Sequence, residues 1–336
     1  MKLTVEQIKK IALGAVYAEE EKGIVKLHRF SREQEALYEV TNEDFYERAL
    51  TPAGVKLSFE TDSENLFLKI FASPATGRRY FSIDVFVGDE MVGSLNNFTG
   101  VEFPKDYYRM RVSVGEFSKN FYLGKEKKKV CVHLPWSVWI DLLDVSLDDG
   151  AYIKPIKPAK KLLAYGDSIT HGYDALHPSN RYVAKLAKAL DAEEFNKAIG
   201  GEKFFPPLAK IGDDIDPDYI TVAYGTNDWD CMSAATFREN CRDFFSNLVR
   251  NYPNAKIFAI SPIWREAMED EREWGFSEIE ENIRAAVKDY ETVTVISGLD
   301  LVPWDEKYFA DRIIHPNDSG FGHYSDSLYK KIKEHI

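Results

Sequence analysis

The sequence predicts two regions of different fold class: an all-β, jelly-roll-like sandwich over residues 1–153, and then an α/β domain over residues 154–336. Three observations predict this division. The length of 336 residues exceeds that of an ordinary single domain. Short, alternating apolar runs fill the first half of the chain, which is typical of antiparallel strands. In the second half, apolar strand-like runs alternate with helix-like segments, which indicates a parallel sheet covered on both faces.

The N-terminal region begins with a short predicted helix, because Thr4 and Gln7 form a capping box ahead of the apolar residues Ile8 and Ile11. The apolar runs that follow are broken by Gly, Asp, Asn and Pro, which favours a β-sandwich. The strands are expected at residues 55–60, 66–70, 80–87, 120–124 and 129–134.

The segment 154–160 is polar and contains Pro155 and Pro158, so we expect it to link the two domains. After it, the predicted elements of the α/β domain follow one another closely. Strands are expected at residues 162–165, 194–198, 219–224, 256–260 and 293–297, and helices at about 179–190, 234–252, 276–289 and 319–336. A flavodoxin-like order is the expected arrangement of these five strands.

The composition argues against several classes of function. Hydrophobic residues make up 44% of the chain and charged residues 29%, as in a globular protein with a sizeable core. The net charge of −12 disfavours nucleic acid and anionic membranes as partners, and no run approaches the roughly 20 apolar residues of a membrane span. Residues 1–23 lack the apolar core of a signal peptide. The scattered Cys131, Cys231 and Cys241 predict reduced thiols, a cytoplasmic protein and no metal site.

The most informative stretch is 162–172, in which an apolar strand runs into a tight turn at Gly166 and Asp167. Ser168 is therefore expected at the carboxyl edge of the sheet, where open α/β sheets hold their ligands. A serine at that edge can act as a nucleophile if a base reaches its hydroxyl. Three further stretches lie at or beyond strand ends and offer possible partners: 196–202, 224–229 and 311–318.

An acyl-enzyme mechanism needs a base, an orienting carboxylate and oxyanion donors besides the nucleophile. His315 can supply the base and Asp311 the carboxylate. Gly201 and Asn227 can stabilise the oxyanion together with the N–H of Ser168, because a glycine N–H is unshielded and an amide donates without a titrating charge.

Together these stretches resemble the blocks of the SGNH, or GDSL-type, hydrolase family. The four blocks occur in the family's order over about 162–336, as Gly166 to Thr170, Asn196 to Gly201, Gly225 to Asp228 and His315 to Asp318. The resemblance implies a three-layer, flavodoxin-like fold and a serine ester hydrolase without metal or organic cofactor. It implies that Ser168, Gly201, Asn227 and His315 are the four name-giving residues. A β-sandwich ahead of such a domain is similar to carbohydrate deacetylases of this superfamily.

Asp311 departs from the family's usual spacing, because it lies four residues before His315 and not three. Two interpretations stay open. Asp311 completes a triad if the loop absorbs the extra residue, or the site is a dyad in which a backbone carbonyl orients the imidazole. His171 stands where glutamine is common in the family, and we expect it and His323 to be structural.

Each candidate also has a plainer interpretation. Ser168 or Asn227 could cap a helix, His315 could be a surface histidine, and Gly201 could serve a turn only. The order of the four blocks favours the catalytic interpretation. Trp229, Trp264 and Arg265 lie near strand ends and are predicted to bind substrate, with core packing as the alternative for Trp264.

The predicted function is the hydrolysis of short-chain acyl esters, chiefly acetyl esters, of a small molecule or an oligosaccharide. A lipase or thioesterase is the enzymatic alternative, and a non-catalytic carbohydrate-binding protein on a hydrolase fold is the other. Neither nucleic acid nor a membrane is an expected partner, and the oligomeric state stays open. We expect residues 1–150 to border the pocket and restrict the substrate.

Overall fold

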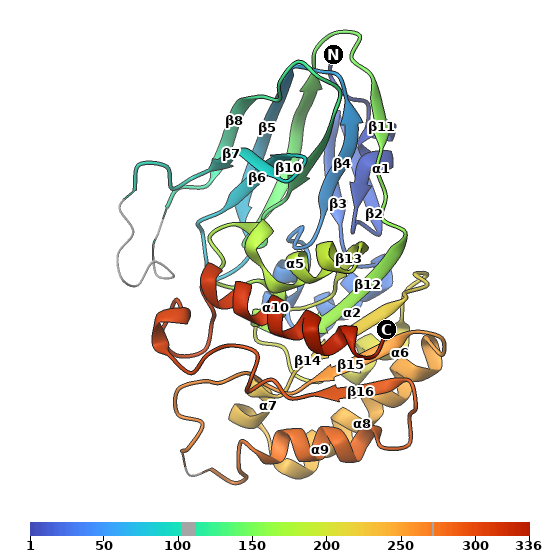
Figure 1. Ribbon diagram of the computed structural model, residues 1–336, viewed down its shortest axis with the longest axis vertical. Coiled ribbons are helices and arrows are strands. Elements are labelled where there is room, and N and C mark those ends of the chain that lie inside the picture. Colours follow the sequence, from blue (N-terminus) through green and yellow to red (C-terminus); the bar gives the residue numbers. More distant parts are fainter. Residues whose placement is uncertain (102–109, 111, 271) are drawn as a thin grey trace.

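The structure of this chain is a computed structural model. It describes residues 1–101, 110, 112–270 and 272–336. A β-rich N-terminal region and an α/β region occupy the two ends of an elongated molecule (Figure 1). The N-terminus lies at the far tip of the β-rich region, and the C-terminus lies at the end of the last helix of the α/β region.

Two antiparallel sheets form the N-terminal region and pack face to face. One has the order β1-β4-β9-β6-β7, with β11 paired to β4, and the other has the order β2-β3-β10-β5-β8. Phe59 of β4 and Ile70 of β5 belong to one buried cluster that both sheets share, so the predicted sandwich is confirmed. The strands are β1 (Ala12–Leu13), β2 (Tyr17–Glu21), β3 (Ile24–His28), β4 (Lys56–Thr61), β5 (Asn65–Pro74), β6 (Ser82–Val87), β7 (Glu90–Asn96), β8 (Gly115–Tyr122), β9 (Lys128–His133), β10 (Val138–Leu147) and β11 (Ile153–Pro155).

The predicted sandwich strands correspond to β4, β5, β6 and β9, whereas the prediction at 120–124 covers only the end of β8. The sequence analysis missed β10, the long central strand of its sheet. The register between β10 and β5 shifts between Leu142 and Asp144. A bulge of this kind interrupts the alternation of apolar and polar residues from which a strand is predicted.

The N-terminal region also contains the helices α1 (Val5–Ile11), α2 (Arg32–Thr41) and α3 (Glu43–Ala49). Helix α1 begins at the predicted capping box. The sequence analysis missed α2 and α3, although Ser31 and Gln34 form an equivalent capping box and Asn42 caps α3. Tyr38 and Ala49 of these two helices pack into the core of the α/β region. The two regions therefore share a buried apolar interface.

Five parallel strands form the α/β sheet in the order β13-β12-β14-β15-β16. This is the expected flavodoxin-like order, which confirms the predicted fold class. The predicted strands are all present, with small shifts at their ends. Their bounds are β12 (Lys160–Gly166), β13 (Ala192–Asn196), β14 (Tyr219–Ala223), β15 (Lys256–Ile260) and β16 (Val293–Ile296).

Helices cover both faces of this sheet, because successive side chains of a strand such as β12 point to opposite faces. Leu162 and Ala164 of β12 join a buried cluster with α5 and α10, whereas Leu163 and Tyr165 face the cluster of α6, α8 and α9. The sequence analysis missed α6 and α7. The helices are α4 (Ser168–His171), η2 (Pro178–Asn180), α5 (Tyr182–Ala189), α6 (Pro206–Ile211), α7 (Thr226–Cys231), α8 (Ala234–Asn251), α9 (Glu278–Val287), η3 (Glu306–Tyr308) and α10 (Asp318–Lys333).

The connection between the two regions is shorter than the predicted linker of residues 154–160. Strand β11 pairs with β4, the N–H of Ile156 donates to Ser58 O at 3.1 Å, and β12 already begins at Lys160. The tether is therefore anchored in a sheet at both of its ends. The predicted domain boundary after residue 153 stays a prediction.

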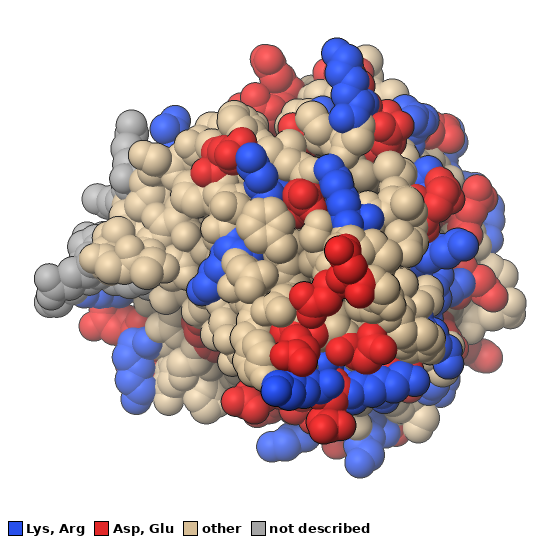
Figure 2. All heavy atoms as spheres, turned by 90° about the horizontal axis from the view of Figure 1, so that it is seen from above, with Lys and Arg blue, Asp and Glu red and all other residues tan. Residues whose placement is uncertain are grey.

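Positive and negative side chains are interspersed over the face drawn in Figure 2. The net charge of −12 is therefore not gathered into one acidic patch on that face. Within the described parts of the chain, no helix combines the length and the apolar character that a membrane span requires.

Candidate active site

Ser168 lies at the carboxyl end of strand β12, as the sequence predicts. Strand β12 ends at Gly166, and Asp167 caps helix α4 by accepting the N–H of Ile169 at 2.9 Å. A side chain at Gly166 has no room, because a β-carbon there would lie 2.3 Å from Thr170 Oγ1. The tight turn therefore needs glycine, and it places Ser168, 7% exposed, at the first position of the helix.

The imidazole of His315 connects Ser168 with Asp311. Its Nε2 lies 2.8 Å from Ser168 Oγ, and its Nδ1 lies 2.6 Å from Asp311 Oδ2. An ionised carboxylate can only accept, so the proton lies on Nδ1 and Nε2 is free to accept the hydroxyl proton of Ser168. The three residues predicted as nucleophile, base and carboxylate thus form one hydrogen-bonded chain.

The loop before His315 absorbs the residue that makes the spacing four instead of three. Asp311 Oδ1 accepts the backbone N–H groups of Ile313, Ile314 and His315 at 2.9, 2.9 and 3.0 Å. Arg312 adopts a left-handed conformation with φ of 60°. The chain therefore turns around one carboxylate oxygen, and the other oxygen faces the imidazole. This geometry supports the triad interpretation over a dyad, and the catalytic role of Asp311 stays a prediction.

The pKa values of His315 and Asp311 are shifted in opposite directions. Burial alone would lower the pKa of His315, but the hydrogen bond with Asp311 and the charges of Asp174 and Asp311 outweigh it, and the pKa is raised. Burial alone would raise the pKa of Asp311, yet the hydrogen bond and charge of His315 and the backbone N–H groups hold it well below its usual range. Asp311 is therefore ionised at neutral pH, and His315 is a stronger base than a free imidazole.

The two predicted oxyanion donors lie on neighbouring segments. Gly201 is exposed and has a φ of +84°, and its N–H makes no hydrogen bond to any residue that the structure describes. Asn227, in α7, is partly exposed, and its Nδ2 donates to Glu202 O at 2.9 Å. That bond fixes the amide and leaves its second N–H for another acceptor. Their role as oxyanion donors stays a prediction.

The loop before the predicted oxyanion glycine is held from the N-terminal region. Arg48 of α3 donates through Nη1 to Gly200 O at 2.6 Å. The N–H of Gly200 donates to His171 Nδ1 at 3.2 Å, and His171 Nε2 lies 2.9 Å from Thr51 Oγ1 and 3.0 Å from Trp136 O. Burial lowers the pKa of His171 well below its ordinary value, so the ring is neutral with its proton on Nε2. His171 thus has the structural position that was expected.

A buried arginine reinforces the same attachment. Arg29 is 0% exposed, and its Nη1 donates to Asn196 O at 2.8 Å and to Ala198 O at 2.9 Å. Its other nitrogens donate to Thr51 O and Arg48 O. Burial lowers the pKa of Arg29 to about 9, so the guanidinium stays charged at neutral pH. The sequence analysis missed Arg29 and Arg48, because their partners lie far along the chain.

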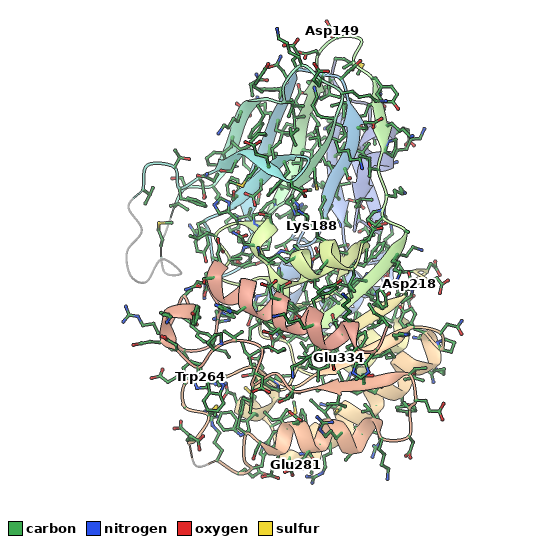
Figure 3. All side chains as sticks on the ribbon, viewed as in Figure 1. Asp149, Lys188, Asp218, Trp264, Glu281 and Glu334 are labelled. Atoms are coloured by element: carbon green, nitrogen blue, oxygen red, sulfur yellow. The ribbon has the colours of Figure 1, made fainter. Side chains whose placement is uncertain are left out.

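The three residues predicted to bind substrate lie in different settings. Trp229 is buried, and its indole N–H donates to Trp274 O at 2.8 Å. Arg265 is 8% exposed, and its Nη1 lies 2.7 Å from Asp230 Oδ2. Trp264 is partly exposed and lies on the side of the molecule where α10 begins (Figure 3). None of these contacts joins them to the candidate triad, and their role in substrate binding stays a prediction.

Two residues directly after helix α4 also face the imidazole, and the sequence analysis missed both. The ring of Tyr173 stacks on that of His315, with centroids 5.7 Å apart. Asp174 Oδ2 lies 3.6 Å from His315 Nδ1. The signal in the sequence is only that both residues follow Ser168 closely.

Oxygen and nitrogen atoms of Asp174, Asp311 and His315 lie within 4.8 Å of one another, as a metal site would require. In this structure the oxygens already accept hydrogen bonds. Asp311 accepts from His315 and the backbone, and Asp174 accepts from Arg78. We therefore interpret the cluster as a proton-transfer site, and the absence of a metal stays a prediction.

Comparison with known proteins agrees with this geometry. Residues 164–322 match the GDSL-like lipase/acylhydrolase family. No curated protein matches the chain. One similar solved structure is a salicylyl-acyltransferase from a tetracycline biosynthetic pathway, which is 20% identical with a TM-score of 0.78 over 96% of this chain and 94% of that chain.

Two further solved structures extend the likeness over nearly the whole chain. A protein of Bacteroides ovatus described as a GDSL-like lipase is 20% identical, with a TM-score of 0.76 over 99% of this chain and 97% of that chain. A family two carbohydrate esterase from Cellvibrio japonicus is 16% identical, with a TM-score of 0.66 over the same shares. At these low identities the likeness shows a shared fold, which includes the β-rich region. Residues 164–322 form a GDSL-like lipase/acylhydrolase domain, which supports a carboxylic ester hydrolase.

Proposed function

We propose that this chain is a serine esterase that removes short acyl groups, acetyl above all, from a carbohydrate through an acyl-enzyme. One observation carries the proposal of the chemistry. His315 Nε2 lies 2.8 Å from Ser168 Oγ while Asp311 holds the opposite nitrogen at 2.6 Å. A serine with a base in hydrogen-bond reach, itself oriented by a carboxylate, is the arrangement of an activated nucleophile.

In the first half of the reaction, Ser168 Oγ bonds to the ester carbonyl carbon while its proton passes to His315 Nε2. The carbonyl oxygen becomes an oxyanion, which the N–H groups of Ser168 and Gly201 and the amide of Asn227 stabilise. The intermediate then collapses: the bond to the alcohol oxygen breaks, and His315 gives that oxygen its proton. Asp311 stays ionised and stabilises the imidazolium throughout.

In the second half, a water molecule replaces the departed alcohol. His315 takes a proton from this water as its oxygen bonds to the acyl carbon, and the same donors stabilise the second oxyanion. Collapse breaks the bond to Ser168 Oγ, which recovers its proton from His315. The products are the free acid and the alcohol, and the enzyme returns to its starting state.

The borders of the site support a short acyl group on a polar alcohol. A β-carbon at Gly201 would lie 3.4 Å from Arg48 Nη1 and 3.7 Å from a ring carbon of Phe45, so α3 closes in on the predicted oxyanion position. On the other side, Arg78 lies over the ring of Tyr173 at 5.4 Å, and Tyr173 covers His315. Close borders of charged and aromatic side chains suit a short acyl group better than a long alkyl chain. The resemblance to a carbohydrate esterase supports the same substrate class.

The test measures kcat/KM for nitrophenyl esters with acyl chains of two to twelve carbons, and acetate release from an acetylated xylo-oligosaccharide. We expect the acetyl or propionyl ester to be best and the oligosaccharide to be deacetylated. Because a pocket for long acyl chains gains about 0.8 kcal/mol per buried CH₂, a lipase would instead show rates that rise with chain length.

Ser168→Ala is the matched control, since it removes one oxygen and should leave the fold and the circular dichroism unchanged. We expect this variant to lose nearly all turnover. A variant that keeps a tenth of the wild-type rate would refute the role of Ser168. If kcat/KM is highest at eight carbons or more, the enzyme is a lipase and not a deacetylase. If the protein binds sugar but hydrolyses none of the esters, it is a carbohydrate-binding protein.

A further inference from the structure

A second carboxylate, besides that of Asp311, faces the imidazole of His315. Asp174 is 0% exposed and adopts a left-handed backbone with φ of 70°, which only a few non-glycine residues do. Its Oδ2 lies 3.6 Å from His315 Nδ1, beyond hydrogen-bond distance but well within the range of a strong charge interaction. Two carboxylates thus lie near Nδ1 of the imidazole, one hydrogen-bonded to it and the other buried and close by.

The N-terminal β-rich region holds this second carboxylate. Arg78, from the segment between β5 and β6, donates Nε to Asp174 Oδ1 at 2.6 Å and Nη2 to Oδ2 at 2.9 Å. The hydroxyl of Tyr80 donates to Oδ1 at 2.8 Å. A two-pronged guanidinium contact fixes both the position and the plane of a carboxylate.

We propose that Asp174, fixed by Arg78 and Tyr80 of the β-rich region, is a positioning residue that orients His315 and stabilises its imidazolium during acyl transfer. This rests on the proposed function, because it assigns a role to the second carboxylate beside the same base. It also makes the β-rich region part of the working catalytic centre, in addition to any contact with substrate.

The charges around His315 come from several elements, and their balance gives the direction of the effect. Asp311 lies on its own loop, Asp174 and Arg78 come from the interface, and Asp167 lies at the end of β12. The positive charge of Arg78 opposes the imidazolium, while both carboxylates favour it. Loss of the Asp174 charge therefore lowers the pKa of His315, and loss of its orientation lowers the rate.

The decisive variant is Asp174→Asn, which keeps the shape and removes the charge. We expect kcat to fall about tenfold, with KM changed less than about twofold, because the imidazolium forms only in the transition state. The acidic limb of the pH profile of kcat/KM should move to lower pH by about half to one unit, because a lower pKa keeps His315 unprotonated in more acid solution.

A matched control exists in the same interface. Asp84 of β6 is also 0% exposed and accepts hydrogen bonds from His177 at 2.7 Å and Ser179 at 2.7 Å, which lie on the segment that follows Asp174. Asp84→Asn should lower the melting temperature as much as Asp174→Asn does, but it should leave the acidic limb in place. If both variants lower kcat equally without moving the limb, Asp174 has only a structural role and the proposal is wrong.

Asp174→Glu keeps the charge and serves both as rescue and as a second variant if Asp174→Asn does not fold. Its acidic limb should stay within about 0.2 pH unit of the wild-type position, although the longer side chain lowers kcat severalfold. If the acidic limb of the pH profile of Asp174→Glu moves as far as that of Asp174→Asn, the charge of Asp174 has no role.

A measurement without turnover separates this proposal from the proposed function. The pKa of His315 is read by NMR from its ring resonances in Ser168→Ala protein, with the peak assigned by its loss in His315→Gln. Asp174→Asn should lower this pKa even if no ester is ever hydrolysed, in which case the esterase assignment fails and the positioning role stands. An unchanged pKa of His315 overturns the positioning role, whatever the enzyme does to esters.

Discussion

Two segments with predicted catalytic residues, 311–315 and 196–202, are held in place in different ways. In the first, Asp311 accepts three backbone N–H groups and the imidazole of His315, all within five consecutive residues. In the second, the carbonyls of 196, 198 and 200 accept from Arg29 and Arg48, which precede them by about half the chain. The hydrogen bonds of the Asp311 loop are therefore local, whereas those that hold 196–202 come from the interface between the two regions.

Asp311→Asn tests the local side and should have the largest effect. The oxygen of the new amide must still accept the three N–H groups, so its NH₂ would face His315 Nδ1. His315 Nδ1 would then have to accept a hydrogen bond from this NH₂, so the proton of the imidazole would lie on Nε2. In that tautomer Nε2 cannot accept the proton of Ser168. We expect kcat to fall about 10³- to 10⁴-fold, as in other triads that lose the right tautomer. A loss of only a few fold in steady-state assays would show that a dyad operates.

Asn227→Ala tests the predicted oxyanion donor of helix α7. Its amide is fixed by Glu202 O, so its free N–H is preorganised for a developing charge. We expect kcat to fall by about a hundredfold or more with a small change in KM, which corresponds to about 2.7–4 kcal/mol for one lost oxyanion donor. A raised KM at constant kcat would instead identify Asn227 as a residue that binds substrate.

Arg48→Met tests whether the interface itself matters for catalysis, and its effect should be the smallest. The substitution removes the bond to Gly200 O but keeps an unbranched side chain, so we expect about a tenfold loss of kcat from a loosened donor geometry. Asp44→Ala is the control, because Asp44 pairs with Arg48 at 3.6 Å and its side chain is 76% exposed. If Arg48→Met and Asp44→Ala both have the kcat of the wild-type enzyme, the loop needs no support from α3.

The same contrast explains what the sequence could predict. Ser168, His315 and the five parallel strands follow from short motifs and apolar runs that are local in the chain. Asp311 could be named, but the left-handed Arg312 that makes its spacing workable is a property of the folded loop. The capping box at Ser31 was a readable signal for α2.

The contacts across the interface left no such signal. Arg78 and Asp174 are separated by nearly a hundred residues, and neither belongs to a recognisable motif. A single Arg or Asp in a sequence is usually a solvated surface residue, so only the folded structure can reveal that Asp174 is buried beside His315 and paired with Arg78. Strand β10 was not predicted for a related reason. Its bulge depends on the pairing with β5, which is a property of the fold and not of the local sequence.

The burial of Arg29 also has a consequence for the order in which the protein is completed during synthesis. Residues 1–153 leave the ribosome before Asn196 and Ala198 exist, so Arg29 Nη1 at first lacks both of its carbonyl acceptors there. Its other nitrogens can still donate to Thr51 O and Arg48 O, but a guanidinium that lacks part of its hydrogen bonds is costly to bury. We therefore expect this face of the nascent β-rich region to stay hydrated. The interface around Arg29 can form only after β13 and the residues that follow it have been made. Residues 196–198 therefore complete the contact between the first half of the chain and the second.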